Sequence, residues 1–236
     1  MAILLKNDAV FLHVPKTGGT YLRRLFVALD LVRFNFSRDH ADMERVINVS
    51  GHYPGNFLRC SMRLGKNLDR YTRHCYKFCF VRHPFDWYES YWRFRCDHPG
   101  ERFVPPRQMR TRFGFKYDDW HPWALVEPLF DPDFNRFLEN VIRHCPGYLT
   151  QLYSWYADPL HIDFVGKQET LIADTRHILD HLGIRYPDAI FQQQGRVNES
   201  RAARPQWDAA NRDMIYRLEY VVFQQYGYSP QGSDPA

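Results

Sequence analysis

The sequence predicts a three-layer α/β fold in which helices flank a mostly parallel central sheet. Three observations favour this fold class. Short apolar segments alternate with longer segments of helical periodicity. A pair of glycines follows the first apolar segment closely, as in a strand–turn–helix unit. The 236 residues are 44% hydrophobic and 25% charged, which is the composition of a globular protein.

The first strand and helix are predicted from the sequence around the glycine pair. The apolar run Ala9–Val14 is typical of a buried strand, and Pro15 ends it. Beyond Gly18 and Gly19, Thr20 is expected to cap a helix, because the apolar residues that follow it recur at helical spacing.

The same two patterns predict the remaining elements. Further strands are expected at 45–49, 76–81 and 162–165. Helices are expected at 84–96, 132–144, 147–157, 170–182 and 206–225. Pro84 suits the first turn of its helix, and Gly183 suits the end of the helix at 170–182.

A single domain is expected over residues 1–228, followed by a flexible polar tail at 229–236. Residues 98–118 are rich in proline, arginine and glycine, so the segment 98–157 is interpreted as an insertion that contains a lid.

Composition and charge exclude several classes of protein. No apolar stretch approaches the roughly 18–20 residues of a membrane-spanning helix, and the N-terminal segment is too short and too soon charged for a secretory signal. Five cysteines without a CxxC pair indicate neither a disulfide framework nor a zinc site, so no metal is expected. A net charge of +4 is small for a dedicated nucleic-acid binder. A cytoplasmic protein without a membrane span is the expectation, with its oligomeric state open.

The segment Pro15-Lys16-Thr17-Gly18-Gly19-Thr20, called the glycine turn below, is the strongest chemical signal. A glycine turn before a helix directs several main-chain N–H groups to one point, where the helix dipole also attracts an anion. Lys16 adds a positive charge, and Thr17 and Thr20 add hydroxyl donors. The turn is not a Walker A sequence, because its lysine precedes the glycines.

A second anion site is predicted after the strand at 76–81. Arg82 leaves the end of that strand just before a helix begins, and Ser90 lies within the helix. A guanidinium group matches the geometry of phosphate, and a hydroxyl can add one more donor.

The two motifs together, Pro15–Thr20 and Val81-Arg82-His83-Pro84 with Ser90, resemble the cofactor motifs of sulfotransferases that use 3′-phosphoadenosine 5′-phosphosulfate (PAPS). The resemblance is closest to the carbohydrate branch of that family, of the heparan and chondroitin type. It extends through residues 164–169, 196–200 and 226–228. The sequence departs from the family at His83, where an aspartate is frequent.

The resemblance implies that the three-layer α/β fold is P-loop-like, and it implies a role for each matching residue. The 5′-phosphosulfate would lie among Lys16, Thr17, Gly18, Gly19, Thr20 and Tyr21. The 3′-phosphate would be bound by Arg82 and Ser90, and residues 196–201 would close over the nucleotide, with Arg196 or Arg201 as a further contact.

The implied reaction moves a sulfuryl group to an acceptor hydroxyl by in-line displacement, which requires charge stabilisation on the leaving phosphate and a base for the hydroxyl proton. Lys16 suits the first role. Among 11 histidines, His52 is the favoured base, because it follows the strand expected at 45–49 and resembles a Gly-His segment of the carbohydrate branch. The other candidates are His13, His40, His83, Asp39, Glu44, Glu89 and Glu169.

The acceptor is expected to be a carbohydrate, bound in part by the 98–157 insertion, and next a phenol or aliphatic alcohol. The alternatives from other classes are a P-loop kinase or nucleotide hydrolase, a non-catalytic nucleotide-binding module, and a nucleic-acid binder using the arginines of 101–116. Without a membrane anchor the sequence resembles a soluble, bacterial-type enzyme or a shortened chain, and the Met1 start favours a complete one.

Overall fold

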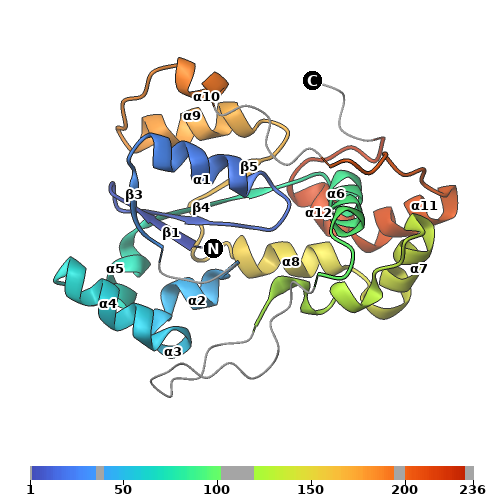
Figure 1. Ribbon diagram of the computed structural model, residues 1–236, viewed down its shortest axis with the longest axis horizontal. Coiled ribbons are helices and arrows are strands. Elements are labelled where there is room, and N and C mark those ends of the chain that lie inside the picture. Colours follow the sequence, from blue (N-terminus) through green and yellow to red (C-terminus); the bar gives the residue numbers. More distant parts are fainter. Residues whose placement is uncertain (1, 36–39, 102–119, 194–199, 232–236) are drawn as a thin grey trace. The chain divides into compact units, whose positions relative to one another are not determined.

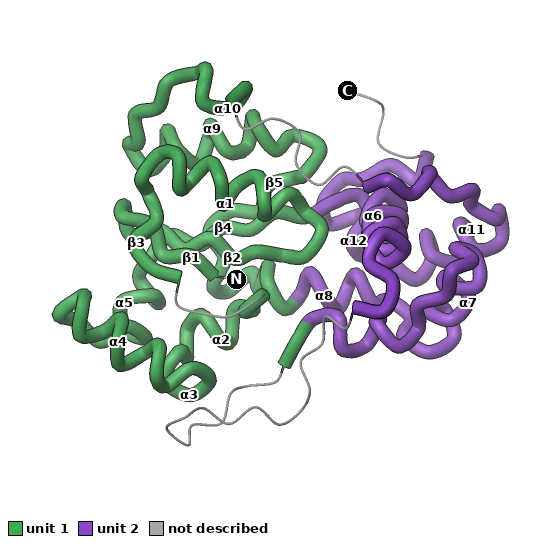
Figure 2. The backbone as a smooth tube through the Cα atoms, viewed as in Figure 1, with its two compact units in different colours: residues 1–81, 105–121, 155–197 green, residues 82–104, 122–154, 198–236 purple. Residues whose placement is uncertain are grey.

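The computed structural model describes residues 2–35, 40–101, 120–193 and 200–231 (Figure 1). The chain divides into two compact units (Figure 2). Unit 1 comprises Met1–Val81, Pro105–His121 and Trp155–Val197, and unit 2 comprises Arg82–Val104, Pro122–Ser154 and Asn198–Ala236. No helix in the described ranges is long and apolar enough to cross a membrane.

Unit 1 contains a five-stranded sheet of order β3-β1-β2-β4-β5. Its strands are β1 (Ala2–Leu5), β2 (Ala9–Leu12), β3 (Val32–Asn35), β4 (Tyr76–Val81) and β5 (Phe164–Lys167). β2 pairs with β4 and β4 with β5 in parallel, whereas β1 is antiparallel to both β2 and β3. The α/β class is confirmed, whereas the expectation of a mostly parallel sheet is confirmed only in part, since β1 pairs antiparallel with both of its neighbours.

Helices cover both faces of this sheet. Figure 1 shows α1 (Gly19–Ala28) and α9 (Leu171–His181) over one face, with α2 (Met43–Ile47), α4 (Pro54–Leu64) and α5 (Leu68–His74) on the other. The first face packs Phe11 and Phe78 of the sheet against Phe26 of α1 and Leu179 of α9, all fully or almost fully buried. Every residue of β2 is buried, which explains why it appears in the sequence as an uninterrupted apolar run.

The strand expected at 45–49 is wrong: α2 and α3 (Val49–His52) occupy this segment. Two local caps explain the difference. The side chain of Asp42 accepts from the N–H of Arg45, and that of Asn48 accepts from the N–H of Gly51. These caps outweigh the strand propensity of the β-branched residues at 46–49.

Other predicted elements are confirmed with small changes. The strand expected at 162–165 lies two residues later, as β5, and the helix expected at 206–225 is divided at Glu219. Gly183, at a φ of 65°, follows α9 as expected. The elements not yet given are α6 (Pro84–Asp97), α7 (Phe134–His144), α8 (Tyr148–Tyr156), α10 (Ala189–Gln193), α11 (Ala209–Leu218), α12 (Tyr220–Gln225) and the 3₁₀ helices Pro122–Ala124 and Glu127–Leu129. Most of the 98–118 segment, together with the end of the tail, lies outside the described residues.

Unit 2 is organised around a buried carboxylate. Glu219 is inaccessible to solvent and lies where α11 gives way to α12. Its oxygens accept from the hydroxyl of Tyr88, from the N–H of Leu149, and from both the N–H and the hydroxyl of Thr150. The carboxylate therefore stabilises the N-terminal end of α8, where a negative charge is favourable.

Candidate active site

The glycine turn connects β2 to α1 in unit 1, as predicted. Two of its residues have left-handed backbones, Lys16 with a φ of 66° and Gly18 with a φ of 88°. Thr17 is fully buried, and its hydroxyl donates to the carbonyl of Val14 at 2.9 Å. This hydroxyl therefore stabilises the turn, and a contribution of Thr17 to anion binding would come from its main-chain N–H.

The N-terminus of α1 has the features of an anion site. Gly18 is its N-cap and makes no side-chain cap, and the described residues of the first turn include no acidic side chain. The N–H groups of this turn and the positive end of the helix dipole therefore meet beside Lys16. The expectation that Thr20 caps the helix is wrong, because α1 begins at Gly19 and Thr20 is its second residue.

Gly19 is required by a close approach. A Cβ atom at this position would lie 1.8 Å from Cδ2 of His13, so any side chain would displace that imidazole. The start of α1 thus packs directly against His13. Tyr21, the third residue of α1, donates its hydroxyl hydrogen to the carbonyl of Phe191 on α10.

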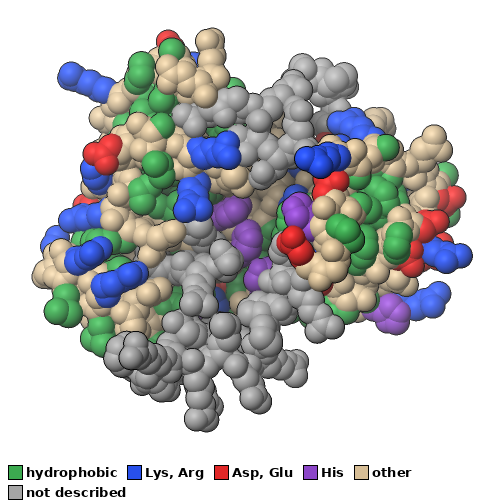
Figure 3. Space-filling model, in the orientation of Figure 1, with side chains coloured by type: hydrophobic (Ala, Val, Ile, Leu, Met, Phe, Trp, Pro, Cys, Tyr) green, Lys and Arg blue, Asp and Glu red, His purple; other side chains and the backbone are tan. Residues whose placement is uncertain are grey.

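Three histidines of unit 1, called the histidine row below, extend from this point: His13, His40 and His121. The ring centroids of His13 and His40 are 4.6 Å apart, and those of His40 and His121 are 5.6 Å apart. Figure 3 shows histidine side chains close together on the face drawn there, next to lysine and arginine side chains. Within the described ranges, no three His, Cys, Asp or Glu side chains are arranged to hold a metal ion, the row included.

His40 is held in an unusual conformation. Its φ is 56°, a left-handed value that costs a non-glycine residue free energy. The hydroxyl of Tyr156 donates to its carbonyl at 2.5 Å, and its Nδ1 lies 3.2 Å from the carbonyl oxygen of His13. A carbonyl can only accept, so Nδ1 carries the proton in this contact, and the lone pair of the neutral ring lies on Nε2.

Burial keeps both neighbouring imidazoles neutral. It lowers the pKa of His13 well below its usual value, and the positive charges of Lys16 and Arg23 lower it further. Burial also lowers the pKa of His40 well below its usual value, with smaller contributions in the same direction from His13 and His121. A neutral His40 with its lone pair on Nε2 can accept a proton at neutral pH.

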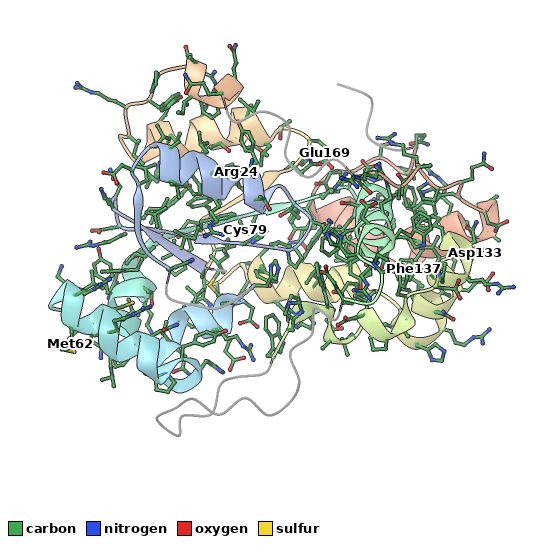
Figure 4. All side chains as sticks on the ribbon, in the orientation of Figure 1. Arg24, Met62, Cys79, Asp133, Phe137 and Glu169 are labelled. Carbon is green, nitrogen blue, oxygen red and sulfur yellow. The ribbon has the colours of Figure 1, made fainter. Side chains whose placement is uncertain are left out.

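His52 lies elsewhere in unit 1, at the last residue of α3. Its Nε2 is 3.4 Å from Oε1 of Glu44 on α2. The structure thus pairs two of the residues considered as bases. Of the others, Glu89 accepts from the indole of Trp207, Glu169 lies in the turn between β5 and α9 (Figure 4), and Asp39 is outside the described residues.

Arg82 and Ser90 belong to unit 2. The hydroxyl of Tyr153 holds the backbone of Arg82. It accepts from the N–H of Arg82 at 3.0 Å and donates to the carbonyl of Arg82 at 2.8 Å. Ser90 is part-buried on α6, nearly two turns after the helix begins.

His83 holds the C-terminal segment of unit 2. Its Nε2 lies 2.8 Å from the carbonyl oxygen of Ser229, and its ring packs against Phe85, Phe223 and Tyr228. A carbonyl accepts, so Nε2 is the donor. An aspartate, which is frequent here in the family that the motifs resemble, could not donate in this way when ionised.

The segment that contains Arg201 is bound along α6. Asp97 accepts from the hydroxyl of Ser200 and from the N–H groups of Arg201 and Ala202, while the guanidinium of Arg93 donates to the carbonyls of Ser200 and Ala202. Positions 90, 93 and 97 lie on one side of a helix, so this segment follows the side that carries Ser90. Arg196 lies outside the described residues.

Sequence reasoning did not single out several of these residues. Tyr153, Tyr156 and His121 act through contacts with residues far away in the chain, such as the 116 positions that separate Tyr156 from His40. The one local signal was Asp42, a good helix cap three residues before Arg45, which would have indicated a helix beginning beside His40.

Comparisons with known proteins agree with the motifs. The model of a family described as the sulfotransferase family matches residues 3–227. Carbohydrate sulfotransferase 12 of Mus musculus is 26% identical over 264 residues, covering 94% of this chain and 58% of the relative. Carbohydrate sulfotransferase 11 of Danio rerio is 22% identical over 251 residues, covering 92% and 64%. The chain therefore spans about three fifths of the length of these relatives, and no solved structure matches it.

Proposed function

The chain belongs to the sulfotransferase family, and on that basis we propose that it transfers a sulfuryl group from PAPS to a hydroxyl of a carbohydrate acceptor. The observation that carries this proposal is the glycine turn, in which Lys16 closely precedes the N-terminus of α1 and the N-cap of that helix is a glycine. PAPS would supply the activated sulfuryl group, and the displacement is proposed to be in line. A phenol or alcohol acceptor is the second candidate.

The residues present fit the two anionic ends of this donor. The 5′-phosphosulfate is assigned to Lys16, Thr17, Gly18, Gly19, Thr20 and Tyr21, where main-chain N–H groups and one lysine meet. The 3′-phosphate is assigned to Arg82 and Ser90, with Arg201 or Arg196 as an additional contact. That Arg201 follows the side of α6 carrying Ser90 supports its inclusion.

The proton of the acceptor hydroxyl is proposed to pass to a histidine. His52 is the candidate from sequence, and the structure supports His40 as a second. The ring of His40 contacts that of His13, which packs on the first residue of α1. Its neutral form, with the lone pair on Nε2, is the form that accepts a proton.

Three expectations from the sequence remain proposals. Residues 1–228 form one sulfotransferase domain, residues 98–157 provide a lid or acceptor-binding insertion, and the protein acts in the cytoplasm without a metal.

Calorimetric titration of adenosine 3′,5′-bisphosphate, without metal, tests the proposed donor. We expect this nucleotide to bind more tightly than 5′-AMP, because only the bisphosphate can use both anion sites. ATP with magnesium is the comparator for the kinase alternative. Tighter binding of ATP with magnesium, or equal binding of the bisphosphate and 5′-AMP, would contradict the assignment.

Tyr153→Phe is expected to weaken binding of the bisphosphate about two- to tenfold, since it removes the hydroxyl that holds both main-chain polar groups of Arg82. The affinity for 5′-AMP, which lacks the 3′-phosphate, should change little. Tyr148→Phe is the matched control, because it removes a hydroxyl that donates to the carbonyl of Pro122 from the same helix. If both variants only lower the melting temperature and leave the ratio of the two affinities unchanged, Tyr153 does not position Arg82 for phosphate.

A further inference from the structure

We propose that Trp120 and Trp155, called the tryptophan pair, form the platform on which the ring of the sugar acceptor stacks. The inference rests on the proposed function and deepens it by assigning an acceptor subsite to named residues of unit 1. The juxtaposition that carries it is a series of contacts from the start of α1 through the histidine row, together with the positions of Trp120 and Trp155 next in sequence to two residues that contact His40.

The series begins at the assigned donor site. Gly19 packs on His13, the ring of His13 contacts that of His40, and the ring of His40 contacts that of His121. Trp120 immediately precedes His121. The ring centroids of Trp120 and Trp155 are 5.4 Å apart, and the two ring planes make an angle of 74°. The donor site, a proton acceptor and a pair of indoles thus follow one another in the order that transfer to a ring hydroxyl requires.

Both tryptophans are tied to His40 through a neighbour in sequence. His121 contacts the His40 ring, and Tyr156, which follows Trp155, donates to the His40 carbonyl. The pair therefore lies next in sequence to two residues, distant from each other in the chain, that both contact His40, one at its ring and one at its carbonyl. Both indoles are part-buried and keep accessible surface, unlike Trp87 and Trp123, which are buried.

Trp120 packs against a buried arginine. The guanidinium of Arg45 lies 4.2 Å from the centre of the Trp120 ring, and it also pairs with the carboxylate of Asp42 at 2.8 Å. Asp42 in turn caps α2. A fixed indole loses little conformational entropy when a ligand binds, which is the property of a preorganised platform.

The chemistry of the pair selects the class of ligand. Indoles offer large apolar faces with one polar N–H, which suits a pyranose ring that has an apolar C–H face and hydroxyls at its edge. The charge of Arg45 is already paired with Asp42, so the pair recognises a ring rather than an anionic group. The names of the two relatives, both carbohydrate sulfotransferases, agree with a sugar acceptor.

The test measures sulfuryl transfer from labelled PAPS to unsulfated chondroitin, heparosan and p-nitrophenol. With a glycan acceptor, Trp155→Leu should raise the acceptor KM about tenfold, whereas Trp155→Phe, which retains an aromatic face, should stay within about threefold. Trp207→Leu is the matched control, since it removes a part-buried tryptophan of unit 2 and should leave the acceptor KM unchanged. Affinity for adenosine 3′,5′-bisphosphate should be the same in all variants that remain folded.

A second readout does not depend on turnover. Titration of chondroitin or heparosan oligosaccharides into the bisphosphate-loaded protein should change its tryptophan fluorescence, and Trp155→Leu should lose that change. Transfer to p-nitrophenol alone, a glycan KM that is equal in wild type and Trp155→Leu, or no fluorescence response to either glycan would overturn the platform. Sulfuryl transfer to either glycan would still support the proposed function and transfer to p-nitrophenol alone would favour its second candidate, whereas failure to bind the bisphosphate would refute use of PAPS itself.

Discussion

Replacement of His40 by alanine is expected to lower kcat for sulfuryl transfer by about 10²–10⁴-fold, the usual contribution of a well-placed general base. Affinity for adenosine 3′,5′-bisphosphate should change little, because the assigned phosphate contacts are elsewhere. The reason is structural: Nδ1 of His40 faces the carbonyl of His13, so the proton-accepting lone pair lies on Nε2 of a ring that burial keeps neutral. Steady-state kinetics with labelled PAPS and a fixed acceptor provide the measurement.

The matched comparison is with His52→Ala, the base favoured from sequence. His52 pairs with Glu44 at 3.4 Å rather than belonging to the histidine row. Loss of turnover in the His40 variant alone would assign the base to His40, and loss in the His52 variant alone would restore the hypothesis from sequence. Because alanine is strained at the φ of 56°, His40→Asn serves as a second variant, since asparagine tolerates this conformation better. His161→Ala, at an exposed histidine, is the neutral control.

The pH dependence of the same reaction gives an independent criterion. A base must be neutral to act, and a pKa lowered below 6.5 means that His40 stays neutral into mildly acidic solution. The decrease of kcat/KM in acid should therefore have its midpoint well below pH 6.5, and a midpoint above that value would argue against His40.

The same lowered pKa values make the stability of the protein depend on pH. The unfolded chain takes up protons at His13 and His40 at higher pH than the folded chain, so the free energy of unfolding should decrease as the pH falls below 6.5. The profile must then be limited to the pH range in which circular dichroism shows the protein folded.

Local signals account for what could be predicted of the fold. β4 and α6 were predicted almost residue for residue, because an apolar run followed by a proline at the first helical position determines both boundaries. β1 and β3 were missed. β3 is a four-residue strand at the edge of the sheet, which is defined by its pairing with β1 more than by its own composition, and β1 is a four-residue strand between β3 and β2.

The residues of the candidate site likewise fall into those that a sequence motif predicts and those that only long-range contacts bring together. The glycine turn and Arg82 are sequence motifs, whereas the environment of His40 depends on its pairing with His13, 27 residues away, and with Tyr156. His52 was favoured because it was expected to follow a strand at the edge of the sheet, and that premise failed when residues 43–52 proved helical. The comparison of His52→Ala with His40→Ala described above therefore decides whether His52 is the base.

Replacement of Lys16 by alanine is expected to lower kcat by about 10²–10³-fold, the loss typical of a single group that stabilises developing charge in the transition state. Lys16 brings a positive charge to the N-terminus of α1, whose first turn holds no acidic residue. Because Lys16 is part-buried, its charge interacts more strongly with a nearby anion than a charge in bulk water would. The measurement is kcat at saturating PAPS, with Lys66→Ala, at an exposed lysine of the same unit, as the control.

Lys16→Gly separates this role from folding. At a φ of 66° lysine and alanine are both strained, whereas glycine is not, so the glycine variant should show the same loss of kcat without being less stable. Either variant also removes a charge that lowers the pKa of His13, so the His13 pKa, followed by NMR, should rise. A variant with a kcat within about threefold of wild type would show that Lys16 does not stabilise the leaving phosphate, since the charge of one catalytic lysine is normally worth far more. Low kcat combined with a large drop in melting temperature would instead identify the lysine as part of the turn's structure, and retention of stability by Lys16→Gly decides between these two explanations.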